Sequence, residues 1–275
     1  MTEPRNEDLR PPTGSYFGVV VFSCGNLGVE VANRLSRLAD VDAVTLVSAP
    51  YRHPRRSLAR KIKHAYRMLG PVGLLRAIVG RVFGRRRTAP DDAVDSPKEL
   101  AEEVSHLRFD QFSSRECLAA VDDLGVQLGV VAGTYILPKE LFALPALGSI
   151  NLHSGDATRY RGSAPGFWEM YNGEETVGIT IHRVTDVLDG GAILAQQLFP
   201  LNPAPPGDPQ GYLIRYRRQV LRPNGVRLLA ETVARIRAET VEERQQPAAE
   251  ARTYRMPTYR ETRELRRRVQ QRRSV

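Results

Sequence analysis

The first fifty residues constrain the fold most, because they read as a strand, a tight turn, a helix and a second strand. Residues 16–23 (YFGVVVFS) form an apolar, β-branched run that predicts a buried strand. The turn CGNLG follows, and apolar residues then recur at helical spacing through GVEVANRLSRLAD. Residues 41–49 (VDAVTLVSA) predict a second buried strand. This βαβ opening predicts an α/β protein with a Rossmann-like, mostly parallel sheet and helices on both faces.

Later segments continue the same pattern. We predict strands at 126–133, 148–153, 177–185 and 192–201, a short helix at 136–144 and a last packed helix at 223–239. The chain has 275 residues, of which 41% are hydrophobic, and this is enough for one large α/β core. We therefore expect one main domain over residues 15–240.

Two basic segments do not follow this alternation of strands and helices. An insert at about 52–95 holds twelve Lys or Arg residues between Arg52 and Arg87, with no acid among them, and it is interleaved with apolar stretches. Such an insert can lie on an anionic membrane surface, or it can pack on the domain with its arginines in water; both remain open. Residues 241–275 form an Arg-rich tail that predicts a solvated arm or a frayed helix.

Composition excludes several classes of protein. No stretch approaches the roughly 18 apolar residues of a membrane span, and the charged N-terminus does not resemble a signal peptide. We expect a cytoplasmic protein, with contact at the inner membrane surface left open. Cys24 and Cys117 lack metal-ligand spacing and lie far apart, so neither a metal site nor a disulfide is predicted. The net charge of +9 favours anionic partners.

One short motif carries candidate chemistry. Asn151 and His153 lie two residues apart after an apolar strand, so on extended backbone their side chains share a face at the carboxyl end of the sheet. Asp189 follows in an LDGG turn. An amide can stabilise an oxyanion, an imidazole can transfer a proton and a carboxylate can support the imidazole. Because no GxSxG elbow is present, this set favours acyl transfer to a nucleophile supplied by the substrate, such as an amine.

The competing interpretation is that the motif is structural, since a lone histidine at a strand end is more often a packing residue. His182 also lies on a predicted strand, but it lacks a partner asparagine in its own motif, so we interpret it as structural. The remaining histidines receive the same interpretation: His53, His64 and His106.

Four ordered motifs add a family resemblance. The segments NLH, RYRGSAP, NGEETVGITIH and TDVLDGG resemble the core of the folate-dependent formyltransferases, which act on glycinamide ribonucleotide, methionyl-tRNA or amino sugars. The resemblance is firm from Val126 to Ala195 and absent over the basic insert and the tail. It implies that residues 15–240 form the catalytic domain, and that the catalytic residues are Asn151, His153 and Asp189.

The same resemblance implies the ligands. The formyl donor would be 10-formyltetrahydrofolate, held mostly through backbone hydrogen bonds by two segments: Thr134, Tyr135, Ile136 and Leu137, and Val184, Thr185, Asp186 and Val187. The acceptor would meet Gly25 and Asn26 in the CGNLG turn, where helix N-terminal amides favour phosphate, and also Arg161. The sequence departs from the family pattern at one place: SGDAT follows His153 where family members carry HPSLLP or a close relative. In the family this loop lines the site and bears on the choice of acceptor.

The acceptor that we favour is a small-molecule amine, first of all an amino-sugar nucleotide, whose anionic diphosphate suits a basic protein. Another metabolite amine or glycinamide ribonucleotide is the alternative. A tRNA acceptor is disfavoured, because about 35 residues after Thr240 cannot form the β-barrel domain of methionyl-tRNA formyltransferases. Three rivals remain: a 10-formyltetrahydrofolate hydrolase, a non-catalytic folate- or nucleotide-binding relative, and a basic RNA- or membrane-binding protein. A homodimer is left open.

Overall fold

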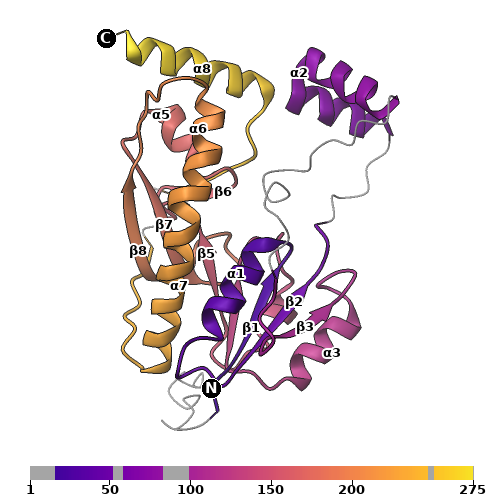
Figure 1. The fold of residues 1–275 in the computed structure, drawn as a ribbon, viewed down its shortest axis with the longest axis vertical. Helices are drawn as coiled ribbons and strands as arrows, with labels where there is room; N and C mark the ends of the chain where they lie inside the picture. The colour runs from indigo at the N-terminus through magenta and orange to yellow at the C-terminus, as the bar shows by residue number, and fades with distance from the viewer. Residues whose placement is uncertain (1–15, 52–57, 83–98, 247–250, 275) are drawn as a thin grey trace, which may run out of the picture.

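The computed structural model describes residues 16–51, 58–82, 99–246 and 251–274 (Figure 1). Of the basic insert, only residues 58–82 fall within these ranges, and His53 lies outside the described residues.

A seven-stranded mixed sheet forms the centre of the fold. Five parallel strands come first and two antiparallel strands extend one edge. In spatial order they are β3 (Ser105–Arg108), β2 (Ala43–Ser48), β1 (Gly18–Ser23), β4 (Leu128–Val131), β5 (Ser149–His153), β7 (Thr176–Arg183) and β8 (Ile193–Pro200). The predicted α/β fold with a mostly parallel sheet is confirmed. Strand β3 was not predicted, because its four partly exposed residues at the sheet edge show no apolar pattern.

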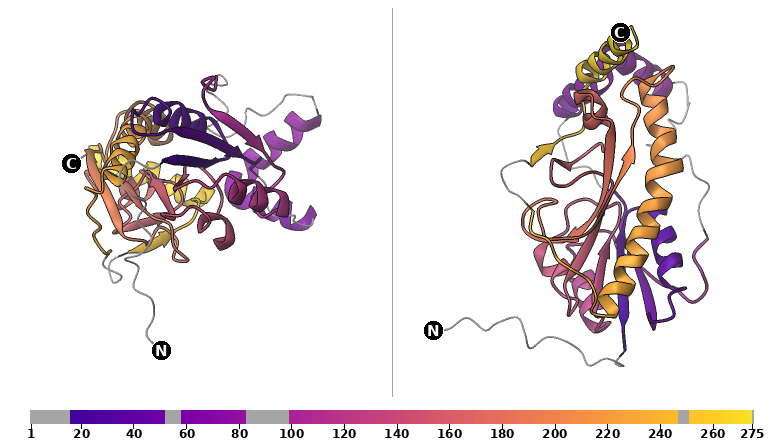
Figure 2. Two further views of the ribbon diagram at one scale, coloured as in Figure 1. Left: turned by 90° about the horizontal axis from the view of Figure 1, so that it is seen from below. Right: turned by 90° about the vertical axis from the view of Figure 1, so that its left-hand side faces the viewer.

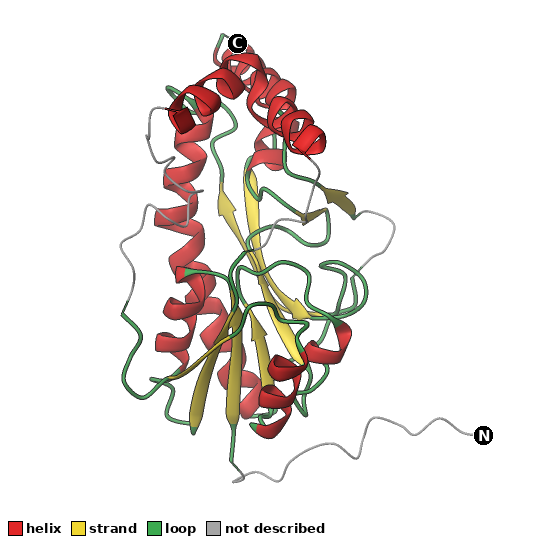
Figure 3. Cartoon of the chain, turned by 90° about the vertical axis from the view of Figure 1, so that its right-hand side faces the viewer, coloured by secondary structure: helices red, strands yellow, loops and turns green. Residues whose placement is uncertain are grey.

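Helices cover both faces of this sheet, as Figures 1 and 3 show. Side chains alternate along β1, so that Val19 and Val21 face one core while Val20 and Phe22 face the other. Helices α1 (Asn26–Leu35) and α7 (Arg222–Arg237) contribute to the first core, and α3 (Arg115–Asp123) and α4 (Lys139–Phe142) contribute to the second.

Apart from α2, which contacts α8, the remaining elements lie near the β7–β8 end of the sheet (Figures 1 and 2). A second sheet of two parallel strands, β6 and β9, joins residues that are about ninety positions apart. A π-helical turn connects α6 to α7 without a loop. The bounds are β6 (Tyr160–Gly162), α5 (Phe167–Asn172), α6 (Pro209–Tyr216), η2 (Arg217–Leu221), β9 (Arg252–Tyr254), α8 (Tyr259–Arg273) and α2 (Leu58–Val82), which is kinked at Gly70.

The expectation that the Arg-rich tail is a solvated arm or frayed helix is wrong. Helix α8 begins with a capping box in which Thr258 and Glu261 satisfy each other's backbone N–H groups. Leu265 and Val269, one helical turn apart, are buried in the same core as α1 and α7. Two apolar residues at helical spacing are therefore enough to dock a helix whose other positions are mostly charged.

Candidate active site

Strand pairing places the candidate catalytic side chains on one face of the sheet. In the antiparallel pair β5–β7, Asn151 lies opposite His182 and His153 lies opposite Thr180. Directly opposite residues point to the same face of an antiparallel sheet, and residues two apart on a strand do too. One patch of this face therefore carries all four side chains.

Asp189 reaches this patch from the turn between β7 and β8. Its backbone adopts the left-handed region (φ 49°), and a side chain at Gly191 would overlap the carbonyl oxygen of Arg183, so the tight turn requires glycine there. Asp189 Oδ1 lies 3.4 Å from Asn151 Nδ2, and Asp189 Oδ2 lies 3.5 Å from His153 Nδ1. The three side chains singled out in the sequence thus converge, although 38 residues separate the first from the last.

His182 belongs to the same cluster, which corrects the interpretation that it has no partner asparagine. Its Nε2 lies 3.1 Å from Asn151 Nδ2 and 3.4 Å from Asp189 Oδ1, and the side chain is buried. Sequence reasoning missed this partnership because it depends on the β5–β7 register. The signal available was that NLH and TIH both place polar side chains at alternate positions of neighbouring strands.

Backbone carbonyls fix which nitrogen of each ring carries a proton. His153 Nε2 lies 2.8 Å from the Tyr160 carbonyl oxygen, and His182 Nδ1 lies 2.8 Å from the Arg183 carbonyl oxygen. A carbonyl oxygen only accepts, so both of these nitrogens donate. In neutral His153 the lone pair therefore sits on Nδ1, which faces Asp189. In neutral His182 it sits on Nε2, which accepts from Asn151.

Burial and charge set the resting protonation states. Burial lowers the pKa of His153, and the nearby Asp189 carboxylate offsets part of this effect, so the ring is neutral near pH 7. Burial alone would raise the pKa of Asp189. The 3.4 Å contact with His182 Nε2, the electrostatic influence of His153 and the Gly162 N–H, which donates to Oδ2 at 2.7 Å, outweigh it and lower the pKa to about 2. The site therefore pairs an ionised carboxylate with a neutral imidazole.

The amide of Asn151 keeps one N–H for a ligand. Asn151 Nδ2, His182 Nε2 and Asp189 Oδ1 form a triangle with sides of 3.1, 3.4 and 3.4 Å. One N–H that is directed between the two acceptors can therefore be shared by them. Because the two amide hydrogens diverge, the second points away from this triangle.

The SGDAT segment that departs from the family pattern is tied down over the β7–β8 hairpin. Asp156 Oδ1 accepts from Thr158 N and from Gln196 Nε2, and Thr180 Oγ1 donates to the Gly155 carbonyl oxygen. A side chain at Gly155 would press on His153 Nε2 and on the Tyr160 carbonyl oxygen. The glycine therefore makes room for the hydrogen bond that orients His153.

The chain after α7 packs over the LDGG turn. Gln246 Nε2 donates to the carbonyl oxygens of Asp189 and Gly191, at 2.9 and 2.6 Å. Arg161, which the sequence suggested as an acceptor-binding residue, donates through Nη2 to Gln246 Oε1 and through Nε to the Ala157 carbonyl oxygen. In this structure its side chain holds Gln246 and the turn in place.

The two segments expected to hold the donor lie side by side. Lys139 Nζ, at the start of α4, forms a 2.8 Å ion pair with Asp186 Oδ2, which ties the end of the loop after β4 to the loop after β7. Ile136 and Val187 are 77% and 57% exposed, so each loop presents an apolar side chain. In contrast, Leu137 is buried, and the Tyr135 hydroxyl accepts from Phe112 N. Thr134, Val184 and Thr185 complete the two loops.

The CGNLG turn lies where β1 meets α1. Gly25 is the exposed residue that precedes the helix, Asn26 is its first residue, and the first turn carries no acidic side chain. A side chain at Gly28 would overlap the Ser23 side chain, so close packing of helix on strand requires this glycine. Within the described residues, no group of His, Cys, Asp and Glu side chains has the arrangement of a metal site.

Comparison with solved structures defines the class of fold. A sugar N-formyltransferase from a Shewanella species superposes with a TM-score of 0.55 at 17% identity, over 92% of this chain and 87% of that one. Phosphoribosylglycinamide formyltransferase from Bacillus halodurans gives a TM-score of 0.51 at 13% identity, over 80% and 94%. The architecture is the α/β fold of formyltransferases.

Sequence comparison then gives the family. The profile of the formyl transferase family matches residues 81–206. The methionyl-tRNA formyltransferase of Azobacteroides pseudotrichonymphae is 28% identical over 145 residues, which cover 53% of this chain and 44% of that protein. Residues 81–206 therefore match the formyl transferase family, which is the family that the four motifs resemble. The chain spans less than half the length of this curated relative.

Proposed function

We propose that the protein is an N-formyltransferase that moves a formyl group from 10-formyltetrahydrofolate to a substrate amine, with Asn151, His153 and Asp189 as its catalytic residues. The observation that carries this proposal is the convergence of the three side chains at 3.4 and 3.5 Å from two separate parts of the chain. Their charge states suit the reaction, because Asp189 is ionised and His153 is neutral and able to accept a proton.

The roles follow from the geometry. The amine nitrogen attacks the formyl carbon, forming a new C–N bond, and negative charge develops on the formyl oxygen. The second N–H of Asn151 would donate to that oxygen. His153 Nδ1 would take the proton that the amine loses, and Asp189, 3.5 Å away, would stabilise the resulting imidazolium. The oxyanion would then re-form the carbonyl as the bond to folate N10 breaks, and protonated His153 would pass the proton to N10.

The donor would lie against the two loops joined by Lys139 and Asp186. The exposed apolar side chains Ile136 and Val187 fit the flat face of a pterin ring, and backbone groups of both loops can hydrogen-bond its edge. The proposed donor site consists of Thr134 to Leu137 and Val184 to Val187. When bound, the donor supplies the activated formyl group, and the protein supplies orientation and charge.

An amino-sugar nucleotide is the acceptor that we favour. The N-terminal amides of α1, next to the exposed Gly25 and close to Asn26, offer a site for phosphate. The net charge of +9 also attracts an anionic acceptor. The Shewanella protein of the same fold is described as a sugar N-formyltransferase.

Methionyl-tRNA is the second candidate acceptor, since the curated relative quoted above is named for it. A release assay for tetrahydrofolate separates the possibilities. The full chain would be given 10-formyltetrahydrofolate with one acceptor at a time: an amino-sugar nucleotide, glycinamide ribonucleotide, methionyl-tRNA, or none. Turnover that requires the amino-sugar nucleotide supports the proposal. Turnover only with methionyl-tRNA reassigns the acceptor, and turnover without any acceptor identifies a hydrolase.

A further inference from the structure

Two basic helices from distant parts of the chain pack together at one end of the molecule. Figures 1 and 2 show α2 beside α8, beyond the end of the central sheet. The contact falls at the kink of α2, where Gly70 has φ +69° and a side chain would press into the Tyr259 ring. The absence of a side chain at Gly70 thus lets the first residue of α8 lie against the α2 backbone.

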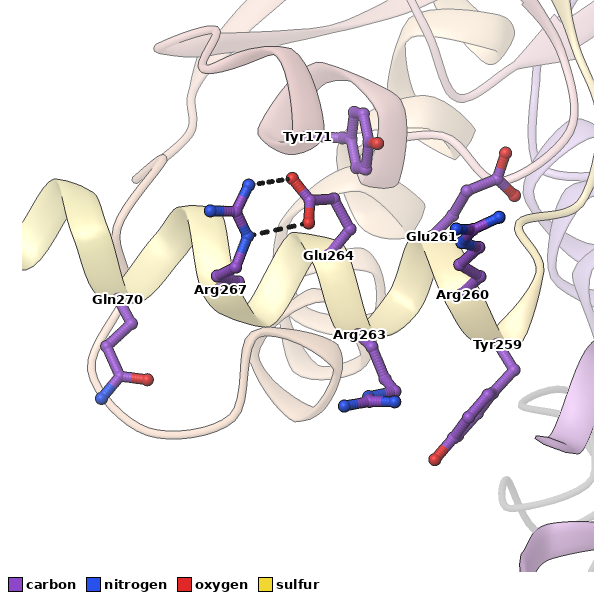
Figure 4. A pocket seen from close by; sticks show the side chains of 8 residues that line it. All are labelled: Tyr171, Tyr259, Arg260, Glu261, Arg263, Glu264, Arg267 and Gln270. Carbon is purple, nitrogen blue, oxygen red and sulfur yellow. Dashed lines mark hydrogen bonds and ion pairs between the residues drawn. The ribbon is translucent and has the colours of Figure 1, made fainter. Parts of the chain in front are cut away.

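This helix pair concentrates the positive charge of the protein. Helix α2 contains six Lys or Arg residues and no acid, and α8 contains seven Arg and two Glu. Together their net charge exceeds the +9 of the entire chain, so the rest of the molecule is slightly acidic. Figure 4 shows a pocket along α8 that is lined by Tyr171 and by seven α8 side chains. These include Arg260, Arg263 and Arg267 but also Glu261 and Glu264, and Glu264 pairs with Arg267 at 2.7 Å.

Helix α2 also exposes large apolar side chains. Ile62, Tyr66, Val72 and Leu75 are each between 50% and 61% exposed. Ile62 and Tyr66 are four residues apart, and so are the exposed Lys63 and Arg67. Because residues four apart stack on one helix face, an apolar ridge runs beside a basic ridge. Apolar side chains that stay in water add no burial energy, so such a ridge is of use only where another surface covers it.

We propose that the α2–α8 pair is a docking surface for an anionic lipid bilayer. The cations complement phosphate headgroups, and the apolar ridge would enter the boundary between headgroups and acyl chains. No helix of the described residues is long and apolar enough to cross a bilayer, so α2 would lie along the surface. The apolar ridge favours a bilayer over a nucleic acid, whose backbone would use the cations alone. This surface does not depend on the proposed catalytic activity.

Vesicle co-sedimentation of the full chain tests the proposal. Vesicles with equal parts of phosphatidylglycerol and phosphatidylcholine should bind the protein, and pure phosphatidylcholine should not. The double variant Lys63→Glu with Arg67→Glu should weaken binding by about fivefold or more for each cation lost. The matched control, Arg34→Glu with Arg37→Glu at the end of α1, makes the same change of charge at two exposed arginines elsewhere and should bind as the wild type does.

A neutral variant separates a bilayer from other polyanions. Changing Ile62, Tyr66, Val72 and Leu75 to Gln leaves the charge intact and removes the apolar ridge together with the two exposed apolar side chains beyond the kink. These side chains are exposed, so an unchanged thermal melt is expected. Loss of vesicle binding supports bilayer docking. Three results would overturn the proposal. The first is a wild type that fails to bind anionic vesicles, and the second is a Gln variant that still binds them. The third is a loss of vesicle binding in the α1 control that equals the loss in the Lys63 and Arg67 variant. Gel-shift binding of tRNA that survives the Gln changes, without vesicle binding, would assign the surface to nucleic acid.

Discussion

Asn151 and His182 face each other across the antiparallel β5–β7 pair, and Asn151 Nδ2 lies 3.1 Å from His182 Nε2. His182 is itself fixed by the 2.8 Å hydrogen bond from its Nδ1 to the Arg183 carbonyl oxygen. A buried imidazole therefore holds the amide that would stabilise the formyl oxygen, and its second contact, at 3.4 Å, is to Asp189. We therefore expect His182 to act as a positioning residue for two members of the proposed catalytic trio.

Replacing His182 should therefore affect turnover more than substrate binding. In His182→Ala the Asn151 amide loses its partner and rotates more freely, so kcat should fall on the order of tenfold to a hundredfold while KM changes little. His182→Gln, which retains a polar partner for the amide, should recover part of the loss. Steady-state kinetics of the three proteins measure this.

A matched control is His106→Ala, because His106 also hydrogen-bonds a neighbouring strand, through Ser48 Oγ at 2.9 Å, but it lies on the edge strand β3. Its kinetics should match those of the wild type. Equal kinetics for His182→Ala and His106→Ala would show that His182 only packs.

The pH dependence of the rate should reflect the buried His153. Burial lowers its pKa below the usual 6.5, and the ring must be neutral to accept the amine proton. Activity is therefore full above this lowered pKa and is lost as the pH falls through it. Asp189, with a pKa of about 2, stays ionised throughout. The acid limb of kcat/KM against pH should have its midpoint below 6.5; a midpoint at or above 6.5 contradicts the proposed state of His153.

Gly162 should tolerate alanine poorly. Its φ is +90°, a side chain would overlap the Tyr254 carbonyl oxygen, and its N–H supports Asp189. Gly125 has φ +55°, but an alanine methyl group there would meet no other atom within 4 Å, so Gly125→Ala is the matched control and should cost about 1–2 kcal/mol. Chemical denaturation should show a larger loss for Gly162→Ala, and its formyl transfer should fall as well. Equal losses would mean that the β6–β9 contact adjusts freely.

Helix α8 should contribute to global stability. Leu265→Ala removes a fully buried side chain from the main core and should cost about 2–5 kcal/mol in the free energy of unfolding. Gln271→Ala changes an exposed position of the same helix and should stay within about 0.5 kcal/mol of the wild type. If both variants unfold like the wild type, the helix does not pack on the core in solution.

The central sheet could be predicted from the sequence because its strands carry local signals. The β-branched run before CGNLG and the run ending in Asn151 and His153 both predicted buried strands, which the structure contains as β1 and β5. The spacing of Asn151 and His153 predicted a shared face, which the β5–β7 register confirms. Asp189 was singled out by its motif alone, because nothing local to an LDGG turn specifies its distance from β5.

The elements that could not be predicted depend on contacts between distant segments of the chain. The pairing of β6 with β9 joins Gly162 to Tyr254, and neither three-residue strand has a pattern of its own. The packing of helix α8 escaped prediction because only two of its described residues, Leu265 and Val269, are buried. An arginine of the same helix, Arg268, packs its guanidinium over the Tyr171 ring at 4.0 Å. Arginine was interpreted as a sign of solvation, yet its planar head also stacks on aromatic rings.

The measurement that tests the account most directly is the acceptor-dependent rate of tetrahydrofolate release from 10-formyltetrahydrofolate, compared between the wild type and Asp189→Asn. Asn keeps the shape of Asp189 but removes the charge that would stabilise the His153 imidazolium, 3.5 Å away. The account predicts amine-dependent release by the wild type and a loss on the order of a hundredfold or more in the variant, with donor binding retained. Equal rates in the two proteins would contradict it.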